Sequence, residues 1–334
     1  MAVLGQTPSL FREQPQSIGL TVTKIEHIEE ELRQHWSLSG PPSRLKGAQN
    51  VVYATMMGDR DVIVRIADST RRSSDQILAE LEWIEHLHNN GVSVCRALPS
   101  AQGELFATLQ NEGGEQYAVV FEKAPGGPLK GLSDVTPSLA RTWGETMGVM
   151  HRVSRDFRPS IGNRPSVHEE GVHNLAAHVL QLQEPLAALE ELVTWMRELP
   201  ADPDAYGIVH TDFQCGNFHV HDGSIYVFDF DDCCYHWRIM EAANALYGLY
   251  FDASTADESL AAYAEVCEHL LDGFIAEFPA IAQWTHHLDR FIQYRIALLY
   301  CWCHNTRDIP AWLERCTPAW RQHLIDWSTR ELLR

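Results

Sequence analysis

The 334-residue sequence has no long apolar run, no internal repeat and no low-complexity tract. Its longest apolar stretch, around Ile296 to Cys303, is far shorter than the ~20 residues that a membrane-spanning helix needs. The first six residues, Met1 to Gln6, lack the basic segment and the long apolar segment of a secretory signal peptide. The sequence therefore predicts a soluble cytoplasmic protein with no membrane partner.

Positive charge is also scarce. Lysine and arginine together number 26 against 45 aspartates and glutamates, which gives a formal net charge of −19. Such a surface repels nucleic acid and anionic lipid, whereas it suits a cationic ligand. The eight cysteines have no disulfide-scaffold spacing, so we expect free thiols in a reducing compartment.

The composition is otherwise that of a globular protein. Apolar residues make up 45% of the chain and charged residues 21%, which excludes disorder, collagen and coiled coil as the main state. Since domains typically have ~100–200 residues, the length predicts two domains or one domain built from two lobes.

The first third of the chain is predicted to be rich in strands. Helical spacing covers residues 21–36, and Ser73-Ser74-Asp75 precedes a second helix on which Ile77, Leu81, Ile84 and Leu87 share a face. Strands are predicted at residues 50–57, 62–66, 105–109 and 117–121. The breakers Pro125-Gly126-Gly127-Pro128 then mark the boundary between residues 1–123 and 124–334.

The rest of the chain is predicted to be mostly helical, with one β-hairpin inserted. Helical periodicity covers residues 138–151, 172–199, 240–250, 259–278 and 281–303, and a last helix is expected after Pro310. Short strands are predicted at residues 208–209, 218–220 and 225–228, the last two joined by His221-Asp222-Gly223-Ser224.

Chemistry concentrates around this hairpin. His210-Thr211-Asp212-Phe213-Gln214-Cys215-Gly216-Asn217 has the pattern H-x-D-x-x-x-x-N, and Asp229-Phe230-Asp231-Asp232 follows one hairpin later. Phosphoryl transfer from ATP needs a carboxylate for the proton of the accepting hydroxyl and oxygen ligands for Mg²⁺. The hairpin returns the chain to the loop, so we expect these groups to converge on one site.

This segment resembles the aminoglycoside phosphotransferase/choline kinase-like family, nearest the type II homoserine kinase-like and stress-response kinase-like branch. The resemblance implies Asp212 as the catalytic base, His210 as a loop-organising residue of the catalytic motif, and Asn217 and Asp229 as Mg²⁺ ligands. Thr211 replaces the usual Gly of this motif, and Gln214 the frequent His.

In the N-terminal region the resemblance implies a nucleotide site. Arg65 stands where kinases place the strand lysine that grips the phosphates, and Arg binds phosphate bidentately. Glu80 matches the helix glutamate that holds this cation, with Glu82 and Glu85 as rivals on the same helix. The remaining candidates for nucleotide contacts are the phosphate-covering turn, with Gly47, Gln49 and Asn50, and the adenine-binding hinge, with Glu122 and Ala124.

The family implies an α+β, bilobal, protein-kinase-like fold, with a five-stranded antiparallel N-lobe carrying one helix and a larger, mainly α C-lobe. We expect transfer of the γ-phosphoryl group of ATP, with Mg²⁺, to a hydroxyl group of a small molecule such as an aminoglycoside, an amino-alcohol or a sugar. The candidate contacts for a cationic acceptor are Asp231, Asp232, Trp237 and Glu241, of which Glu241 also stands where the family has a loop-buttressing acid.

Three alternatives stay open. A stress-response type protein Ser/Thr kinase has the same motif, and an inactive pseudokinase-like binding protein is favoured by Arg65 in place of lysine. A zinc hydrolase is suggested by five side chains, although their spacing matches no zinc motif: His219, His221, Cys233, Cys234 and His236. The sequence assigns no oligomeric state.

Overall fold

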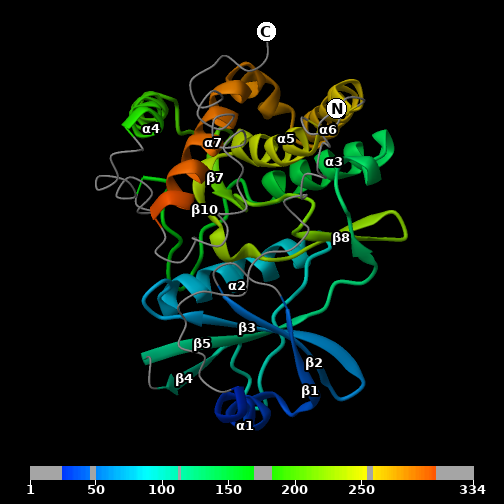
Figure 1. The fold of residues 1–334 in the computed structure, drawn as a ribbon, viewed down its shortest axis with the longest axis vertical. Coiled ribbons are helices and arrows are strands. Elements are labelled where there is room, and N and C mark those ends of the chain that lie inside the picture. The colour runs from blue at the N-terminus through cyan, green and yellow to red at the C-terminus, as the bar shows by residue number, and fades with distance from the viewer. Residues whose placement is uncertain (1–24, 46–49, 112–113, 169–182, 254–258, 306–334) are drawn as a thin grey trace, which may run out of the picture.

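The computed structural model describes residues 25–45, 50–111, 114–168, 183–253 and 259–305. Figure 1 shows these residues as a smaller lobe built on a sheet and a larger, mainly helical lobe, which lie one above the other. The chain passes from the first lobe to the second after the strand that ends at Glu122. The arrangement confirms the predicted α+β fold.

The N-lobe sheet has five antiparallel strands. They are β1 (Leu38–Leu45), β2 (Val51–Met57), β3 (Arg60–Asp68), β4 (Ala107–Asn111) and β5 (Gly114–Glu122), in the spatial order β1-β2-β3-β5-β4. Alternation along β3 buries Val62, Val64 and Ile66 in a cluster with Leu32 and Trp36 of helix α1 (Ile25–Trp36). Arg65 lies between these residues and so points to the opposite face of the sheet.

Strand β1 was not among the strands predicted by residue pattern. Its sequence contains Gly40, Pro41 and Pro42, which are poor strand formers. The register against β2 shifts between Ser39 and Ser43, so a bulge accommodates this stretch at the edge of the sheet. Pairing with β2, which residue pattern does not reveal, makes this segment a strand.

Helix α2 (Ser74–Asn89) lies between the sheet and the C-lobe (Figure 1). Its start is set by Ser73, whose hydroxyl accepts the N–H of Gln76 while the Gln76 side chain accepts the N–H of Ser73. The four residues predicted to share its apolar face are all buried: Ile77, Leu81, Ile84 and Leu87.

The C-lobe is built from α3 (Pro137–Val153), α4 (Gln183–Arg197), α5 (Ile239–Ala253), α6 (Ser259–Glu277) and α7 (Leu288–Asn305). The single helix predicted over residues 281–303 is in fact divided, because η5 (Pro279–His287) is a 3₁₀ segment that precedes α7. The beginning of the helix predicted over 172–199 and the helix expected after Pro310 lie outside the described residues. A short 3₁₀ turn, η1 (Leu132–Asp134), leads into α3.

Two small sheets support the loop motif. Strand β7 (Tyr206–Val209) pairs with β10 (Cys234–Trp237), and β8 (Phe218–His221) pairs with β9 (Ser224–Val227) and β6 (Gly127–Pro128). The β8–β9 turn is formed by Asp222 and Gly223, both at positive φ (49° and 76°), as a tight hairpin requires. Strand β10 was not predicted, because its residues alternate only weakly.

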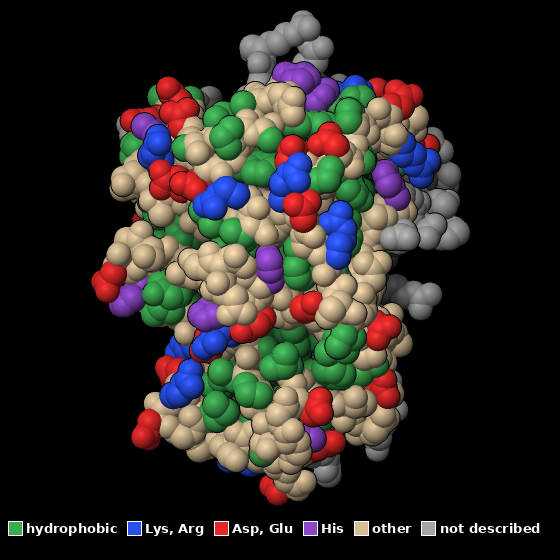
Figure 2. All heavy atoms as spheres, turned by 180° about the vertical axis from the view of Figure 1, so that it is seen from behind, with side chains coloured by type: hydrophobic (Ala, Val, Ile, Leu, Met, Phe, Trp, Pro, Cys, Tyr) green, Lys and Arg blue, Asp and Glu red, His purple; other side chains and the backbone are tan. Residues whose placement is uncertain are grey.

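The described residues contain no helix with the length and apolarity needed to cross a membrane. On the face shown in Figure 2, basic side chains lie among the acidic ones, so no single field of negative charge covers it. Net charge alone therefore does not identify a cation-binding face.

Candidate active site

The loop after β7 is held in place by side chains of helix α5. The carboxylate of Glu241, which is fully buried, accepts the backbone N–H groups of His210 (3.0 Å) and Thr211 (2.8 Å). The side-chain amide of Asn244 donates to the carbonyl of Thr211. Thr211 has a positive φ of 66°, which is rare for a β-branched residue, and its hydroxyl donates to the carbonyl of Asp232 (2.8 Å).

His210 is buried and holds the two motifs together. Its Nε2–H donates to the carbonyl of Phe228 (3.1 Å), and its Nδ1 accepts the backbone N–H of Asp212 (3.3 Å). The ring packs against Phe213 and Phe230. Burial lowers the pKa of His210, in keeping with a neutral ring that donates at one nitrogen and accepts at the other.

Asp212 lies at the turn of this loop, with both carboxylate oxygens engaged. Oδ2 accepts the side-chain amide of Asn217 (2.7 Å), while Oδ1 accepts Gln214 (2.9 Å) and the guanidinium of Arg295 from α7 (2.9 Å). Burial raises the pKa of Asp212 to about 6, although Arg295 acts in the opposite direction. A partly exposed carboxylate held by three donors is well placed to take a proton from an incoming hydroxyl group.

Asn217 and Asp229 are brought together by the β8–β9 hairpin. The backbone N–H of Phe228 donates to the carbonyl of Asn217 (3.0 Å), so Asp229 follows directly beside the start of β8. The Asp229 carboxylate is exposed and accepts no hydrogen bond from the described residues, yet the surrounding protein and Asp231 raise its pKa to about 7. Because the amide nitrogen of Asn217 faces Asp212, its oxygen is left to bind a cation.

These two side chains fit a magnesium ion. Mg²⁺ is bound by one or two protein oxygens together with phosphate oxygens and water, so it needs no larger protein cage. No group of three or more His, Cys, Asp or Glu side chains that could hold a metal occurs within the described ranges, which gives the zinc hypothesis no support there.

Arg65 and Glu80 form a bidentate ion pair beneath the sheet. The two N–O distances are 2.7 and 2.8 Å, and the side chains are only 6% and 0% exposed. The Arg65 guanidinium also lies over the ring of Phe121. Of the three glutamates considered, Glu80 is the partner, whereas Glu82 accepts the backbone N–H groups of Ser160 and Ile161.

Asp231 and Asp232 are engaged by the N-lobe. Asp231 accepts from Asn50 (3.0 Å) and Arg71, and Asp232 accepts from Arg71 (3.0 Å) and Arg72 (2.8 Å). Burial alone would raise the pKa of Asp231, but Arg65, Arg71 and Arg72 hold it well below its usual range. These ion pairs join the two lobes next to Asp229. They enclose Asp231, which is 5% exposed and is not a contact for a cationic acceptor, whereas Asp232 keeps 37% of its side chain exposed.

The other two candidate acceptor contacts are also corrected. Trp237 is 2% exposed and its indole N–H donates to the carbonyl of Pro200 (2.9 Å), so its ring belongs to the core. Both carboxylate oxygens of Glu241 accept backbone N–H groups of the loop, so Glu241 supports the loop and has no oxygen left for a ligand.

The candidate nucleotide contacts are only partly visible. Gly47 and Gln49 lie outside the described residues, whereas Asn50 bridges Arg71 and Asp231. The side chain of Glu122 accepts from Arg60 and Arg96, and its backbone N–H donates to the carbonyl of Arg96 (2.9 Å). The backbone N–H of Ala124 has no acceptor in the described part of the chain.

Sequence reasoning missed the partners supplied from distant segments. Arg71 and Arg72 could have been noticed, since two adjacent arginines lie just beyond the end of β3 at Asp68. Arg295 carried a weaker signal, a charge within the apolar stretch of α7. Gln214 was noticed only as a departure from the family pattern.

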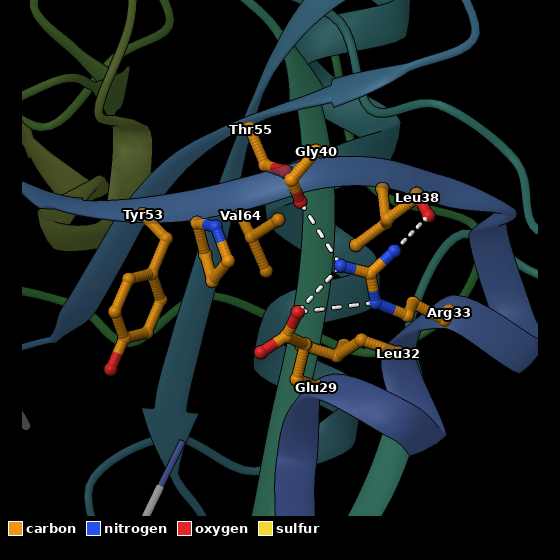
Figure 3. A pocket seen from close by; sticks show the side chains of 9 residues that line it. Glu29, Leu32, Arg33, Leu38, Gly40, Tyr53, Thr55 and Val64 are labelled. Atoms are coloured by element: carbon orange, nitrogen blue, oxygen red, sulfur yellow. Dashed lines mark hydrogen bonds and ion pairs between the residues drawn. The ribbon is translucent and has the colours of Figure 1, made fainter. Parts of the chain in front are cut away.

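A small pocket shown in Figure 3 lies elsewhere. It is formed between α1 and the outer face of the sheet, with Tyr53 and Val64 in its wall. Arg33 crosses it to reach Glu29 and the carbonyls of Leu38 and Gly40. Since Arg65 and Glu80 lie on the other face of β3, this pocket is separate from the candidate active site.

Comparison with known proteins identifies the family. The profile described as the phosphotransferase enzyme family matches residues 43–274. The chain belongs to this family. Amicoumacin kinase of Bacillus subtilis (strain 168) is 31% identical over 86% of this chain and 88% of its own length. The predicted reaction class, phosphoryl transfer, is thereby confirmed.

Solved structures confirm the protein-kinase-like, bilobal fold. Amicoumacin kinase hAmiN, in complex with AMP-PNP, Ca²⁺ and Ami, has a TM-score of 0.80 and 28% identity, covering 91% of this chain and 93% of that one. A microcompartment-associated aminopropanol kinase has a TM-score of 0.69 at 21% identity, covering 91% and 94%, which shows the shared fold. Neither relative is a homoserine kinase or a stress-response kinase, so that nearer branch stays a prediction.

Proposed function

We propose that this phosphotransferase transfers the γ-phosphoryl group of ATP to a hydroxyl group of a small molecule. Asp212 orients the hydroxyl and takes its proton as the hydroxyl oxygen bonds to the γ-phosphorus. The bond from that phosphorus to the bridging oxygen breaks, and ADP leaves. Asn217 and Asp229 would hold Mg²⁺, which neutralises phosphate charge when bound. The observation that carries this proposal is that Asn217 bonds to Asp212 within the loop and that the following hairpin returns the chain beside Asn217 just before Asp229.

Arg65 and Glu80 supply the nucleotide side of the same site. The ion pair fixes the guanidinium, while the charge of Arg65 also reaches Asp229 and Asp231. A fixed cation beside the phosphates lowers the barrier by stabilising negative charge that develops on the transferred group. An inactive pseudokinase is less consistent with these groups, because the base, both metal ligands and the cation are all present.

The acceptor class follows from the relatives. Amicoumacin kinase is 31% identical and spans most of the chain, so amicoumacin is the first acceptor to test. Aminopropanol is the second, on the similarity of fold. Of the side chains considered for a cationic acceptor, Asp231, Trp237 and Glu241 are buried within the protein. Asp232 is 37% exposed, so it is the one of the four that an acceptor can contact.

The test is turnover of MgATP with a panel of acceptors: amicoumacin, aminopropanol, choline, homoserine, an aminoglycoside and a Ser/Thr-bearing protein. We expect Asp212→Asn to lower kcat by about 10²–10⁴-fold, the usual contribution of a general base, with nucleotide affinity retained. Asp202→Asn is the matched control, because Asp202 caps a distant turn. Wild-type transfer by Asp212→Asn would refute the assignment, and phosphorylation of the protein alone would favour a protein kinase.

A further inference from the structure

Helix α7 brings a cation to the predicted base. Nη2 of Arg295 lies 2.9 Å from Oδ1 of Asp212, across 83 residues of sequence. The side chains of Arg295 and Asp212 are 20% and 25% exposed, so this ion pair lies at the accessible edge of the site rather than in the core. It is therefore placed where an acceptor would approach Asp212.

The catalytic loop provides no cation of its own. Residues 209–217 contain neither lysine nor arginine, and the second residue after Asp212 is the neutral Gln214. Gln214 donates to the same oxygen as Arg295, at 2.9 Å. Positive charge on the acceptor side of Asp212 therefore comes from α7, which lies outside the motif.

Arg295 has N–H donors that the contact with Asp212 does not use. A guanidinium carries five N–H groups, and the contact to Asp212 involves only Nη2. Its Nε is buried and has no acceptor in the described part of the chain. An acceptor oxygen from outside the chain would reach not this enclosed nitrogen but the N–H groups on the 20% of the side chain that is exposed.

We propose that Arg295 bridges the base and the acceptor, with Nη2 holding Asp212 and its other N–H donors binding an oxygen of the acceptor beside the reacting hydroxyl. This deepens the proposed function and rests on it. The acceptor class is then a hydroxyl compound that carries a second oxygen, such as a carbonyl, carboxylate or further hydroxyl, close to the one that reacts. A simple monohydroxy amine leaves this contact unmade.

The experiment compares Arg295→Ala and Arg295→Lys with wild type in MgATP turnover. The acceptor is the best one in the panel above, or water, measured as ADP release, if no organic acceptor reacts. For Arg295→Ala we expect kcat to fall about 10²-fold through misplacement of Asp212. The KM of an organic acceptor should rise about tenfold through loss of a charge-assisted hydrogen bond, with the KM of ATP unchanged. Added guanidinium chloride should restore kcat, whereas sodium chloride at equal ionic strength should not.

Arg290→Ala is the matched control on the same helix, because its ion pair is with Glu191, is exposed and does not involve Asp212. Wild-type kcat and acceptor KM in Arg295→Ala would overturn the proposal, and so would a fall in kcat with no change in acceptor KM. If Arg295→Ala does not fold, Arg295→Lys decides: its ammonium keeps the charge but lacks the planar fork that reaches two partners from separate nitrogens, so full activity overturns the proposal and partial activity supports it. Wild type without any MgATP turnover would instead refute the proposed function.

Discussion

Replacing one partner of the buried Arg65–Glu80 pair should cost far more stability than replacing both. Glu80→Leu leaves an uncompensated buried guanidinium, which typically costs about 3–5 kcal/mol. Asp231 remains 3.9 Å from Arg65 and offsets part of this loss, so we expect the lower end, about 3 kcal/mol. Exchange of both residues for apolar ones of similar size, Arg65→Met with Glu80→Leu, should lie within about 1 kcal/mol of wild type.

Thermal unfolding measures the difference directly. A loss of about 3 kcal/mol lowers Tm by about 4 °C in a chain of this size, at about 1.4 °C per kcal/mol. The double variant should recover most of this shift yet remain inactive, because it has no cation for the phosphates. The exposed pair Arg141–Glu145 is the control, and Glu145→Gln should change stability by no more than about 0.5 kcal/mol. If the double variant is as unstable as the two single losses combined, the electrostatic argument is wrong.

Two further predictions concern the loop that carries Asp212. Glu241→Gln turns an amide N–H toward the backbone N–H groups of His210 and Thr211, so we expect a loss of about 1–3 kcal/mol in denaturant unfolding and a lower kcat, with the KM of ATP unchanged. Equal stability would show that the loop does not depend on this carboxylate. Thr211→Gly removes the positive-φ strain, whereas Thr211→Val keeps it, and both lose the hydroxyl bond to Asp232. The glycine variant should therefore be more stable than the valine variant by about 1–3 kcal/mol of unfolding free energy, and so have the higher Tm. The reverse order would refute the strain argument.

Much of the local structure followed from residue pattern. Alternation predicted β3, with Arg65 opposite Val64 and Ile66, because side chains in a strand point to opposite faces in turn. The capping residues of α2 and the Asp-Gly turn of β8–β9 act through neighbouring backbone groups, so they too could be predicted. The motif around Asp212 was found because its members lie close together in sequence.

What depended on distant segments could not be predicted. Segments β1 and β10 are strands because they pair with β2 and β7. The residues of β1 and β10 do not by themselves indicate these pairings. Asp231 was expected to face an acceptor, but arginines from the other lobe bind it.

The candidate base and metal ligands could thus be predicted from short stretches of sequence, since a loop and a hairpin are enough to bring these three side chains together. Their electrostatic setting was decided by the tertiary structure. Arg295 comes to Asp212 only because α7 packs beside the loop, and a contact across 83 residues leaves no periodicity or spacing by which to find it.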